Sequence, residues 1–319
     1  MSAPSHRNPT LGLALVVLGA SLFIVNAGVS RVALRAGVDP VTLTTVRVTG
    51  TVLILVVFAA LFRRSALRPP RGRLAWMLVA HGLVGVAALQ WTYFVAIDRL
   101  PVGMALLLEY QAPILVAVWA RVVQKEQVRG RMWLGLGLAV AGLAAATGIW
   151  RGLAFDVVGI VAGLGAAVCF AAYFLIGEHG VGLLDPLRVI LWSFLFAAVA
   201  LNLVSPLTSL DTTLLGESAS LLGRLGHLEA PVWTLLVWVI VLGTLVPFGV
   251  ELAALRHLRA TTVTMVAMLE PVGVLVLGWL WFHESLGTVA VLGAVAVVVG
   301  IVLAQSARRA AVVVEPPHL

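Results

Sequence analysis

Charged residues are scarce in this sequence of 319 residues, where they make up 11% of the total. A soluble domain carries roughly 25%. Hydrophobic residues make up 61%, and the mean hydropathy is +1.08. A chain with so little polar surface cannot cover itself in water, so its solvent must be lipid. The composition therefore excludes a soluble globular protein and indicates an integral membrane protein.

Cysteine is nearly absent. The single Cys169 lies inside an apolar segment, which is typical of a core position and excludes an intrachain disulfide and a cysteine-cluster metal site. The loop histidines have no metal-ligand spacing either. We therefore expect no metal and no cofactor.

Sequence motifs typical of nucleotide binding, of metalloproteases and of serine hydrolases are also missing. The chain contains no G-x-x-x-x-G-K-[ST], no H-E-x-x-H and no G-x-S-x-G. It has no regularly spaced arginine helix of the voltage-sensor kind. We therefore predict no ATP-driven pumping in this chain, no enzyme activity and no catalytic residues. The basic residues occur in short runs between apolar segments rather than in one patch, so we expect no nucleic-acid partner.

Ten apolar stretches have the length of about 20 residues that a helix needs to cross a bilayer. They cover about 11–30, 41–62, 74–96, 101–121, 132–150, 157–177, 187–207, 232–254, 260–281 and 287–306. The first resembles a signal peptide but has a counterpart in the second half, so we interpret it as a retained helix. The sequence predicts an all-α integral membrane protein of ten transmembrane helices.

Basic residues are distributed unevenly about these stretches. The N-terminus, the even-numbered connections and the C-terminus carry 15 of them, and the odd-numbered connections carry 5. Positive residues favour the cytoplasmic side. The bias predicts that both termini lie in the cytoplasm, and we expect a multi-pass protein of a bacterial-type inner membrane.

The chain repeats itself internally. Asp39-Pro40 matches Asp185-Pro186 at an offset of 146, and Pro113 matches Pro271 at an offset of 158. A longer loop at about 208–231 takes up the difference and leaves the outer face of the second half uncertain. We predict two five-helix units, 1–150 and 151–319. Because five is odd, the second unit enters the membrane from the opposite side, which makes the inverted repeat that recurs in transporters.

Pro113 and Pro271 fall in the middle of the fourth and ninth stretches. A proline there removes a backbone hydrogen bond and bends the helix. Paired interruptions at corresponding positions of two repeats mark transporter binding sites. We predict helix kinks at both prolines; a tolerated kink without a binding role is the alternative.

Two carboxylates lie beside these prolines. Glu109 is four residues before Pro113 and shares its face, and Glu270 directly precedes Pro271. Ionisable groups in a membrane are costly and mark functional sites. The two would bind a substrate ammonium group or carry a coupling proton; a structural ion pair or helix-packing role is the alternative.

Further polar side chains in the stretches are candidates for substrate binding. Gln90 and Tyr93 share a face, and Gln111 ranks below Glu109 because it points roughly 200° away. Glu251 lies near a membrane edge, where a snorkelling position competes with a cavity position. Asn26 and Tyr173 would contact the solute or pack across helices.

Two more ionisable groups lie in the stretches. Arg47 would pair with a carboxylate such as Glu109 or snorkel outward. His81 favours a hydrogen-bonded core position over a proton relay.

The chain resembles the EamA family of the drug/metabolite transporter superfamily over essentially its whole length. The residues that carry the resemblance read AIDRLPVGMALLLEYQAP at 96–113 and ALRHLRATTVTMVAMLEP at 254–271. Glu126 and Glu284 match the glutamate of the family's short turns, where we expect a structural role such as capping the next helix. The L-E-Y-x-x-P and P-x-x-x-E stretches look like the threonine/homoserine exporter branch.

In that family the first, third, fourth, sixth, eighth and ninth helices line a central cavity. The resemblance thus implies a lining role for Asn26, Gln90, Tyr93, Glu109, Tyr173, Glu251 and Glu270. It implies a secondary transporter that exports amino acids or related metabolites by alternating access. A multidrug or other-metabolite exporter of the same fold, and a non-transporting subunit of a lipid-modifying system, are the alternatives. We expect a small-molecule substrate, surrounding lipid and a monomer; proton coupling and facilitated diffusion both stay open.

Overall fold

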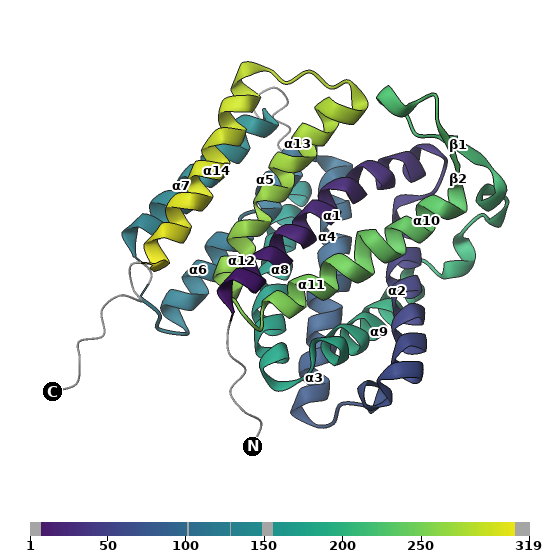
Figure 1. Ribbon diagram of the computed structural model, residues 1–319, viewed down its shortest axis with the longest axis horizontal. Helices are drawn as coiled ribbons and strands as arrows, with labels where there is room; N and C mark the ends of the chain where they lie inside the picture. Colours follow the sequence, from purple (N-terminus) through teal and green to yellow (C-terminus); the bar gives the residue numbers. More distant parts are fainter. Residues whose placement is uncertain (1–7, 101, 128, 149–155, 310–319) are drawn as a thin grey trace.

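Ten long apolar helices form the body of the protein in the computed structural model, which describes residues 8–100, 102–127, 129–148 and 156–309 (Figure 1). Each is long and apolar enough to cross a membrane. The prediction of an all-α protein with ten transmembrane helices is confirmed. The predicted helix starting at residue 101 begins at a position outside the described residues.

The first five spans are numbered in chain order. Span 1 is α1 (Pro9–Arg35) and span 2 is α2 (Pro40–Phe62), followed by the short η1 (Arg64–Leu67). Span 3 consists of three consecutive segments: α3 (Arg73–Ala80), the π-helical η2 (His81–Ala88) and α4 (Leu89–Arg99). Span 4 is α5 (Val102–Glu109) with α6 (Ala112–Val122), and span 5 is α7 (Gly130–Thr147).

The second five spans follow the same order. Span 6 is α8 (Val157–Leu183) and span 7 is α9 (Pro186–Val204). Span 8 comprises α10 (Val232–Ile240), the π-helical η7 (Val241–Leu245) and α11 (Val246–Ala254). Span 9 is α12 (Ala260–Ala267) with α13 (Leu269–Phe282), and span 10 is α14 (Thr288–Arg309).

Spans 2 and 7 begin in the same way because the sequence repeats there. The side chain of Asp39 accepts hydrogen bonds from the backbone N–H groups of Val41 and Thr42, and that of Asp185 accepts one from Leu187. In each case a proline follows at the first helical position, where its missing N–H costs nothing. The repeated Asp-Pro pair is therefore a helix-start signal.

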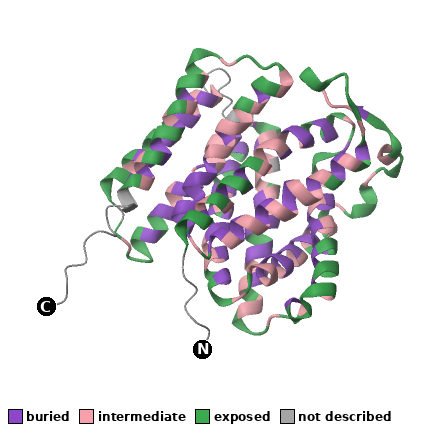
Figure 2. Ribbon diagram, viewed as in Figure 1, coloured by how far each residue is buried: buried purple, intermediate pink, exposed green. Residues whose placement is uncertain are grey.

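Large apolar side chains cover the outside of the bundle, as lipid requires. Leu203 is 82% exposed and Trp76 75% exposed, values that would be a liability in water. Figure 2 shows buried residues on the inward faces of the helices and exposed ones on the outward faces. The outward faces thus form the surface that contacts the acyl chains.

The first helix of each half packs against helices of the other half. Span 1 lies against spans 8 and 9 of the other half, and span 6 lies against spans 3 and 4. At the start of span 1, Gly12 faces Leu258; at the start of span 6, Gly159 faces Leu100. Leu100 and Leu258 are the repeat-related pair, so the same contact occurs twice with opposite direction through the membrane. This reciprocity is the geometry of an inverted repeat.

Spans 5 and 10 form a pair at one edge of the molecule, where α7 and α14 lie side by side (Figure 1). Gly135 packs on Gly300 and Gly142 packs on Gly293, so a Cβ on any of the four would meet backbone atoms of the facing helix. Small residues let helix backbones approach closely in lipid, where dispersion rather than the hydrophobic effect holds helices together.

The long connection between spans 7 and 8 is folded rather than extended. It contains η4 (Leu207–Ser209), η5 (Thr212–Gly216), β1 (Ser218–Ser220), η6 (Gly223–Leu225) and β2 (Glu229–Pro231). The two short strands pair antiparallel, a detail that the all-α prediction did not include. The indole N–H of Trp281 donates to the carbonyl of Leu221 at 2.9 Å. The connection is thereby fastened to the end of span 9.

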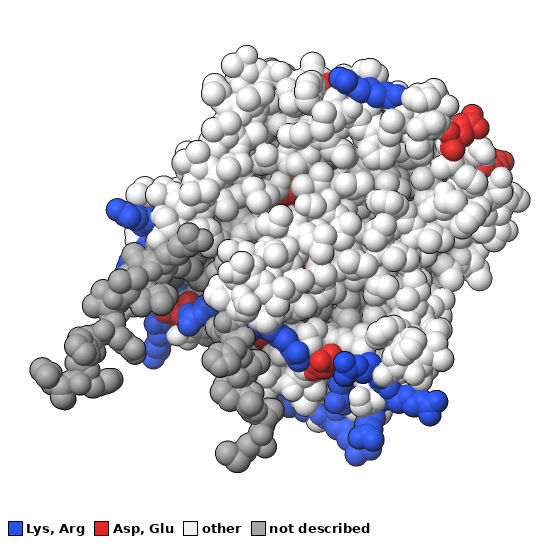
Figure 3. All heavy atoms as spheres, in the orientation of Figure 1, with Lys and Arg blue, Asp and Glu red and all other residues white. Residues whose placement is uncertain are grey.

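Charged side chains lie at the two ends of the molecule. Figure 3 shows most Lys and Arg atoms at the lower end, where α1 begins and α14 ends in Figure 1, with a smaller group at the upper end. Between them the surface is uncharged, apart from a few acidic atoms visible near its centre. That band is the part of the molecule that fits the hydrocarbon layer.

Candidate functional site

Spans 4 and 9 are each interrupted at the same position of their repeat. In span 4, α5 ends at Glu109 and α6 begins at Ala112; in span 9, α12 ends at Ala267 and α13 begins at Leu269. Pro113 and Pro271 cannot donate to the carbonyls four residues before them. Each interruption lies just before the proline and leaves a half-helix N-terminus inside the membrane-spanning region.

The two interruptions bring the predicted carboxylates together. Glu270 interacts electrostatically with both Glu109 and Tyr110. Glu109 and Glu270 are both half-buried, whereas Tyr110 is 4% exposed. The cluster therefore lies at the interface between the repeats, where inverted-repeat transporters place their substrates. Sequence reasoning missed Tyr110, although it directly follows Glu109.

Arg47 belongs to the same cluster. Its Nε donates to the hydroxyl of Thr244 at 2.9 Å, and its Nη2 donates to the carbonyl of Gly243 at 3.2 Å. It also interacts electrostatically with Glu270. The outward, snorkelling alternative is therefore wrong, because span 8 and Glu270 hold the guanidinium inside the bundle. The carboxylate that it faces is Glu270 rather than Glu109.

The Gly243 carbonyl can accept from Arg47 because of the local sequence of span 8. Pro247 lies four residues after Gly243 and has no N–H to donate to it. The hydroxyl of Thr244 donates to the carbonyl of Val239, five residues earlier, across the π-helical η7. π-helical turns are rare and occur most often at functional sites. η7 thus presents one carbonyl and one hydroxyl to Arg47.

Asn26 and Tyr173 occupy repeat-related positions beside the two π-helical segments. A Cβ on Gly243 of η7 would overlap the side-chain amide of Asn26, and a Cβ on Gly85 of η2 would meet Tyr173. The Asn26 Oδ1 and the Tyr173 hydroxyl are buried and have no hydrogen-bond partner among the described residues. A buried polar atom normally has a partner. Both atoms are therefore available to a bound solute or to water.

Glu251 is 3% exposed, so the snorkelling alternative is wrong for it as well. Its side chain packs near Gly19 of span 1 and interacts electrostatically with Glu270, Tyr110 and Tyr173. It extends the carboxylate cluster from span 9 toward spans 6 and 8.

The remaining predicted residues divide into two groups. Tyr93 interacts electrostatically with Glu109 and Glu270 and so belongs to the cluster. Gln90 is half-buried, and no hydrogen bond joins its amide to the cluster within the described part of the chain. The amide of Gln111 donates to the carbonyl of Leu107 at 2.9 Å, on its own helix. Among the described residues, neither Gln90 nor Gln111 forms a hydrogen bond with the carboxylates.

His81, at the start of η2, is a fully buried core residue. Its ring nitrogens hydrogen-bond with the Ser193 hydroxyl at 2.8 Å and the Tyr173 carbonyl at 3.0 Å, and its ring stacks on that of Tyr173. The core prediction for this histidine is confirmed. It fixes the position of Tyr173.

Comparison with known proteins decides the family. The sequence model of the EamA-like transporter family matches residues 10–148 and, a second time, residues 157–305. The chain belongs to the EamA-like transporter family. It is accordingly a multi-pass membrane protein of a transporter family, as the resemblance implied.

This EamA-family chain has distant curated relatives. It is 24% identical over 299 residues to the threonine/homoserine exporter RhtA of Escherichia coli strain K12, with 92% of each chain covered. An uncharacterized transporter of Archaeoglobus fulgidus is 26% identical over 229 residues, which cover 70% of this chain and 75% of that protein. A crystal structure superposes with a TM-score of 0.73 at 19% identity, over 93% of this chain and 98% of that one, and shares the fold.

The turn glutamates typical of the EamA resemblance form ion pairs. Glu126 pairs with Arg259 at one end of the bundle, and Glu284 pairs with Arg31 at the other. Arg31 also lies 4.4 Å from the ring centre of Phe282. Both glutamates thus join elements that are distant in sequence, as the expected structural role implies, and Glu126 does not cap α7, which has no side-chain cap.

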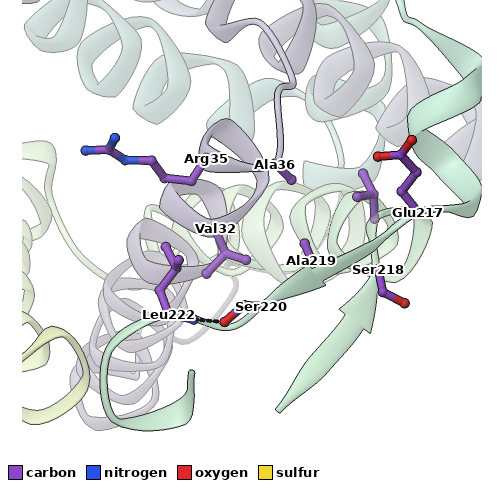
Figure 4. Close-up of a pocket in the computed structure, with 9 residues that line it drawn as sticks. Val32, Arg35, Ala36, Glu217, Ser218, Ala219, Ser220 and Leu222 are labelled. Atoms are coloured by element: carbon purple, nitrogen blue, oxygen red, sulfur yellow. Dashed lines mark hydrogen bonds between the residues drawn. The ribbon is translucent and has the colours of Figure 1, made fainter. Parts of the chain in front are cut away.

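Two surface cavities of about 290 Å³ each lie away from the cluster. Figure 4 shows the first, which lies between the end of α1 and the β1 segment; the backbone N–H of Leu222 donates to the Ser220 hydroxyl at its rim. The second lies between the end of α8 and the connection after α2. They occupy repeat-related places at opposite ends, and neither contains a carboxylate of the central cluster.

Proposed function

We propose that this chain exports amino acids or closely related small metabolites by alternating access, with its solute site at the central cluster. The observation that carries the proposal is the pair of broken spans. They bring Glu109, Glu270 and Tyr110 together with Arg47 at the interface of two inverted repeats. Charged side chains in a membrane interior are expensive and are retained for function.

The exchanged packing of the halves supports alternating access. Spans 1 and 9 pack against each other, as do spans 6 and 4, so each half contributes to both walls of the centre. Rocking of the repeats would then expose one fixed site to either side in turn. Ion pairs at both ends, Arg31 with Glu284 and Arg259 with Glu126, would break and form in that motion.

Two features support an amino acid as the solute. The cluster holds carboxylates and a guanidinium, the groups that complement an ammonium and a carboxylate. The relative over nine-tenths of the chain is named a threonine/homoserine exporter.

The proposal is tested by uptake of radiolabelled amino acids into proteoliposomes. The wild type should show saturable flux for at least one amino acid. Glu109→Gln should lower its kcat/KM by about 100-fold, the loss expected when a buried charged contact is removed. Flux is measured under a substrate gradient and with the flux of protein-free vesicles subtracted.

Glu229→Gln is the matched control, because Glu229 is exposed in the long connection and lies outside the cluster. It should transport like the wild type. Absence of flux for every amino acid in the wild type would refute amino-acid export. Normal flux in Glu109→Gln would still support a carrier but would show that this carboxylate is not part of the solute site.

We further propose that both termini lie in the cytoplasm. In a Cys169→Ser background, a membrane-impermeant maleimide applied to intact spheroplasts should label Glu229→Cys and leave Ser65→Cys unlabelled until the membrane is opened. Both positions are exposed and lie in connections at opposite ends of the bundle. Labelling of Ser65→Cys from outside would reverse the orientation.

A further inference from the structure

Arg47 is only partly satisfied by the protein. Its Nε and Nη2 donate to Thr244 and Gly243, both in η7 of span 8. No described residue accepts a hydrogen bond from its Nη1. A guanidinium has five N–H donors in a rigid fork suited to a carboxylate. Span 8 therefore fixes the position of the Arg47 guanidinium and leaves its Nη1 available to a ligand.

Glu270 faces Arg47 without touching it. The two interact electrostatically, yet they form no direct ion pair among the described residues, whereas four ion pairs elsewhere do close. Two opposite charges in a medium of low dielectric attract strongly and would close if nothing else held them. Here Thr244 and Gly243 of span 8 hold Arg47. The guanidinium is thus held by uncharged groups of span 8 and not by a direct ion pair.

The cluster has a cationic side and an anionic side. Arg47 comes from span 2 and is attached to span 8, whereas Glu109 and Glu270 come from spans 4 and 9. Asn26, 5% exposed, packs on the Gly243 whose carbonyl binds Arg47, and its unpartnered Oδ1 can accept from an N–H or O–H group of a solute. A molecule with a carboxylate at one end and an ammonium at the other complements this arrangement, but a simple amine does not.

We propose that Arg47 binds the carboxylate of the transported solute, with Thr244 as the positioning residue that aims the guanidinium, so the chain selects zwitterions over the corresponding amines. This inference rests on the proposed function, because it names the solute class of that same site. It also gives the orientation of the bound solute, whose carboxylate points toward spans 2 and 8 and whose ammonium points toward spans 4 and 9.

The test compares amino acids with their amides, which keep the ammonium and lose the carboxylate. Threonine with threoninamide, and phenylalanine with phenylalaninamide, are the probes in proteoliposomes. The wild type should prefer each acid over its amide by about 10- to 100-fold in kcat/KM, the discrimination given by hydrogen bonds to a charged group. Arg47→Gln should lower the flux of the amino acids and leave the flux of their amides unchanged, so that the preference for the acid disappears.

Thr244 supplies a graded variant. Thr244→Val removes the hydroxyl that accepts from Arg47 Nε but keeps the charge, so KM for the acids should rise while KM for the amides stays constant. Thr244→Ser keeps the hydroxyl and should behave like the wild type. Arg71→Gln, an exposed arginine outside the cluster, is the control for loss of one positive charge.

Each outcome decides the inference. An equal loss for acids and amides in Arg47→Gln overturns it and makes Arg47 a structural counter-charge. Equal wild-type transport of acids and amides overturns it too, while leaving the carrier in place. If no acid or amide is transported, the proposed function fails, and ligand-induced thermal stabilisation decides the inference. Stabilisation of the wild type by the acids but not the amides, lost in Arg47→Gln, supports it; no such difference overturns it.

Discussion

Glu270→Gln should reduce transport by about 100-fold or more, the largest loss among the single neutralisations in the central cluster. The electrostatic interactions of the cluster converge on Glu270, which interacts with Arg47, Glu109, Glu251 and Tyr110. Its loss also leaves Arg47 inside the membrane without the counter-charge it faces, which costs about 3–5 kcal/mol in a buried pair. Initial rates in proteoliposomes and thermal melting in detergent measure the two effects separately.

Three companion variants separate charge from hydrogen bonding. Tyr110→Phe removes only the hydroxyl that interacts with Glu270 and should lower transport by about tenfold. Glu270→Gln combined with Arg47→Gln should recover thermal stability but not transport. Glu217→Gln, in the long connection, should match the wild type. Wild-type rates in Glu270→Gln would show that the solute does not use this carboxylate.

Gly142→Leu should destabilise the fold at the upper end of the roughly 1–3 kcal/mol typical of overpacking, or prevent folding. A side chain at Gly142 would meet the Gly293 carbonyl and the backbone of Val297 on α14. Backbone atoms cannot change rotamer, so spans 5 and 10 must separate. Gly293→Leu should have a similar effect, because the contact is reciprocal.

The same helix offers the matched control. A Cβ at Gly137 of α7 would meet no atom, so Gly137→Leu should melt close to the wild type. The natural Cys169, 9% exposed in α8, supplies the readout, since a thiol-reactive dye labels it as the bundle opens. Equal melting temperatures for the two leucine variants would contradict the close approach of spans 5 and 10.

Hydropathy located the spans well because bilayer thickness fixes how many apolar residues a span needs. It underestimated span 1, which was predicted to end at residue 30 and continues to Arg35, and span 6, which was predicted to end at residue 177 and continues to Leu183. The extra turns carry polar residues such as Arg31 and Glu178. Hydropathy marks where the hydrocarbon layer ends, whereas a helix continues until its backbone hydrogen bonds end.

Glu109 and Glu270 were candidates for one site because Glu109 lies four residues before Pro113 and Glu270 directly precedes Pro271, the matching proline of the other repeat. The direction of Arg47 did not follow, since it depends on how α2 is rotated against span 8. Its partner Thr244 lies in η7, where a π-helical turn changes which face each residue occupies. A 3.6-residue period read from sequence cannot show that change.

The exchanged packing of spans 1 and 6 has a consequence during synthesis. Gly19 of span 1 packs near Glu251 of span 8, more than two hundred residues later in the chain. At a translation rate of about 5–20 residues per second, span 1 waits on the order of ten to fifty seconds for this partner. Throughout that interval the amide of Asn26 is in the bilayer without the η7 neighbours that later bury it. The first helix to be inserted is therefore among the last to reach its final packing. Neither half can complete its core before the other half has been synthesised.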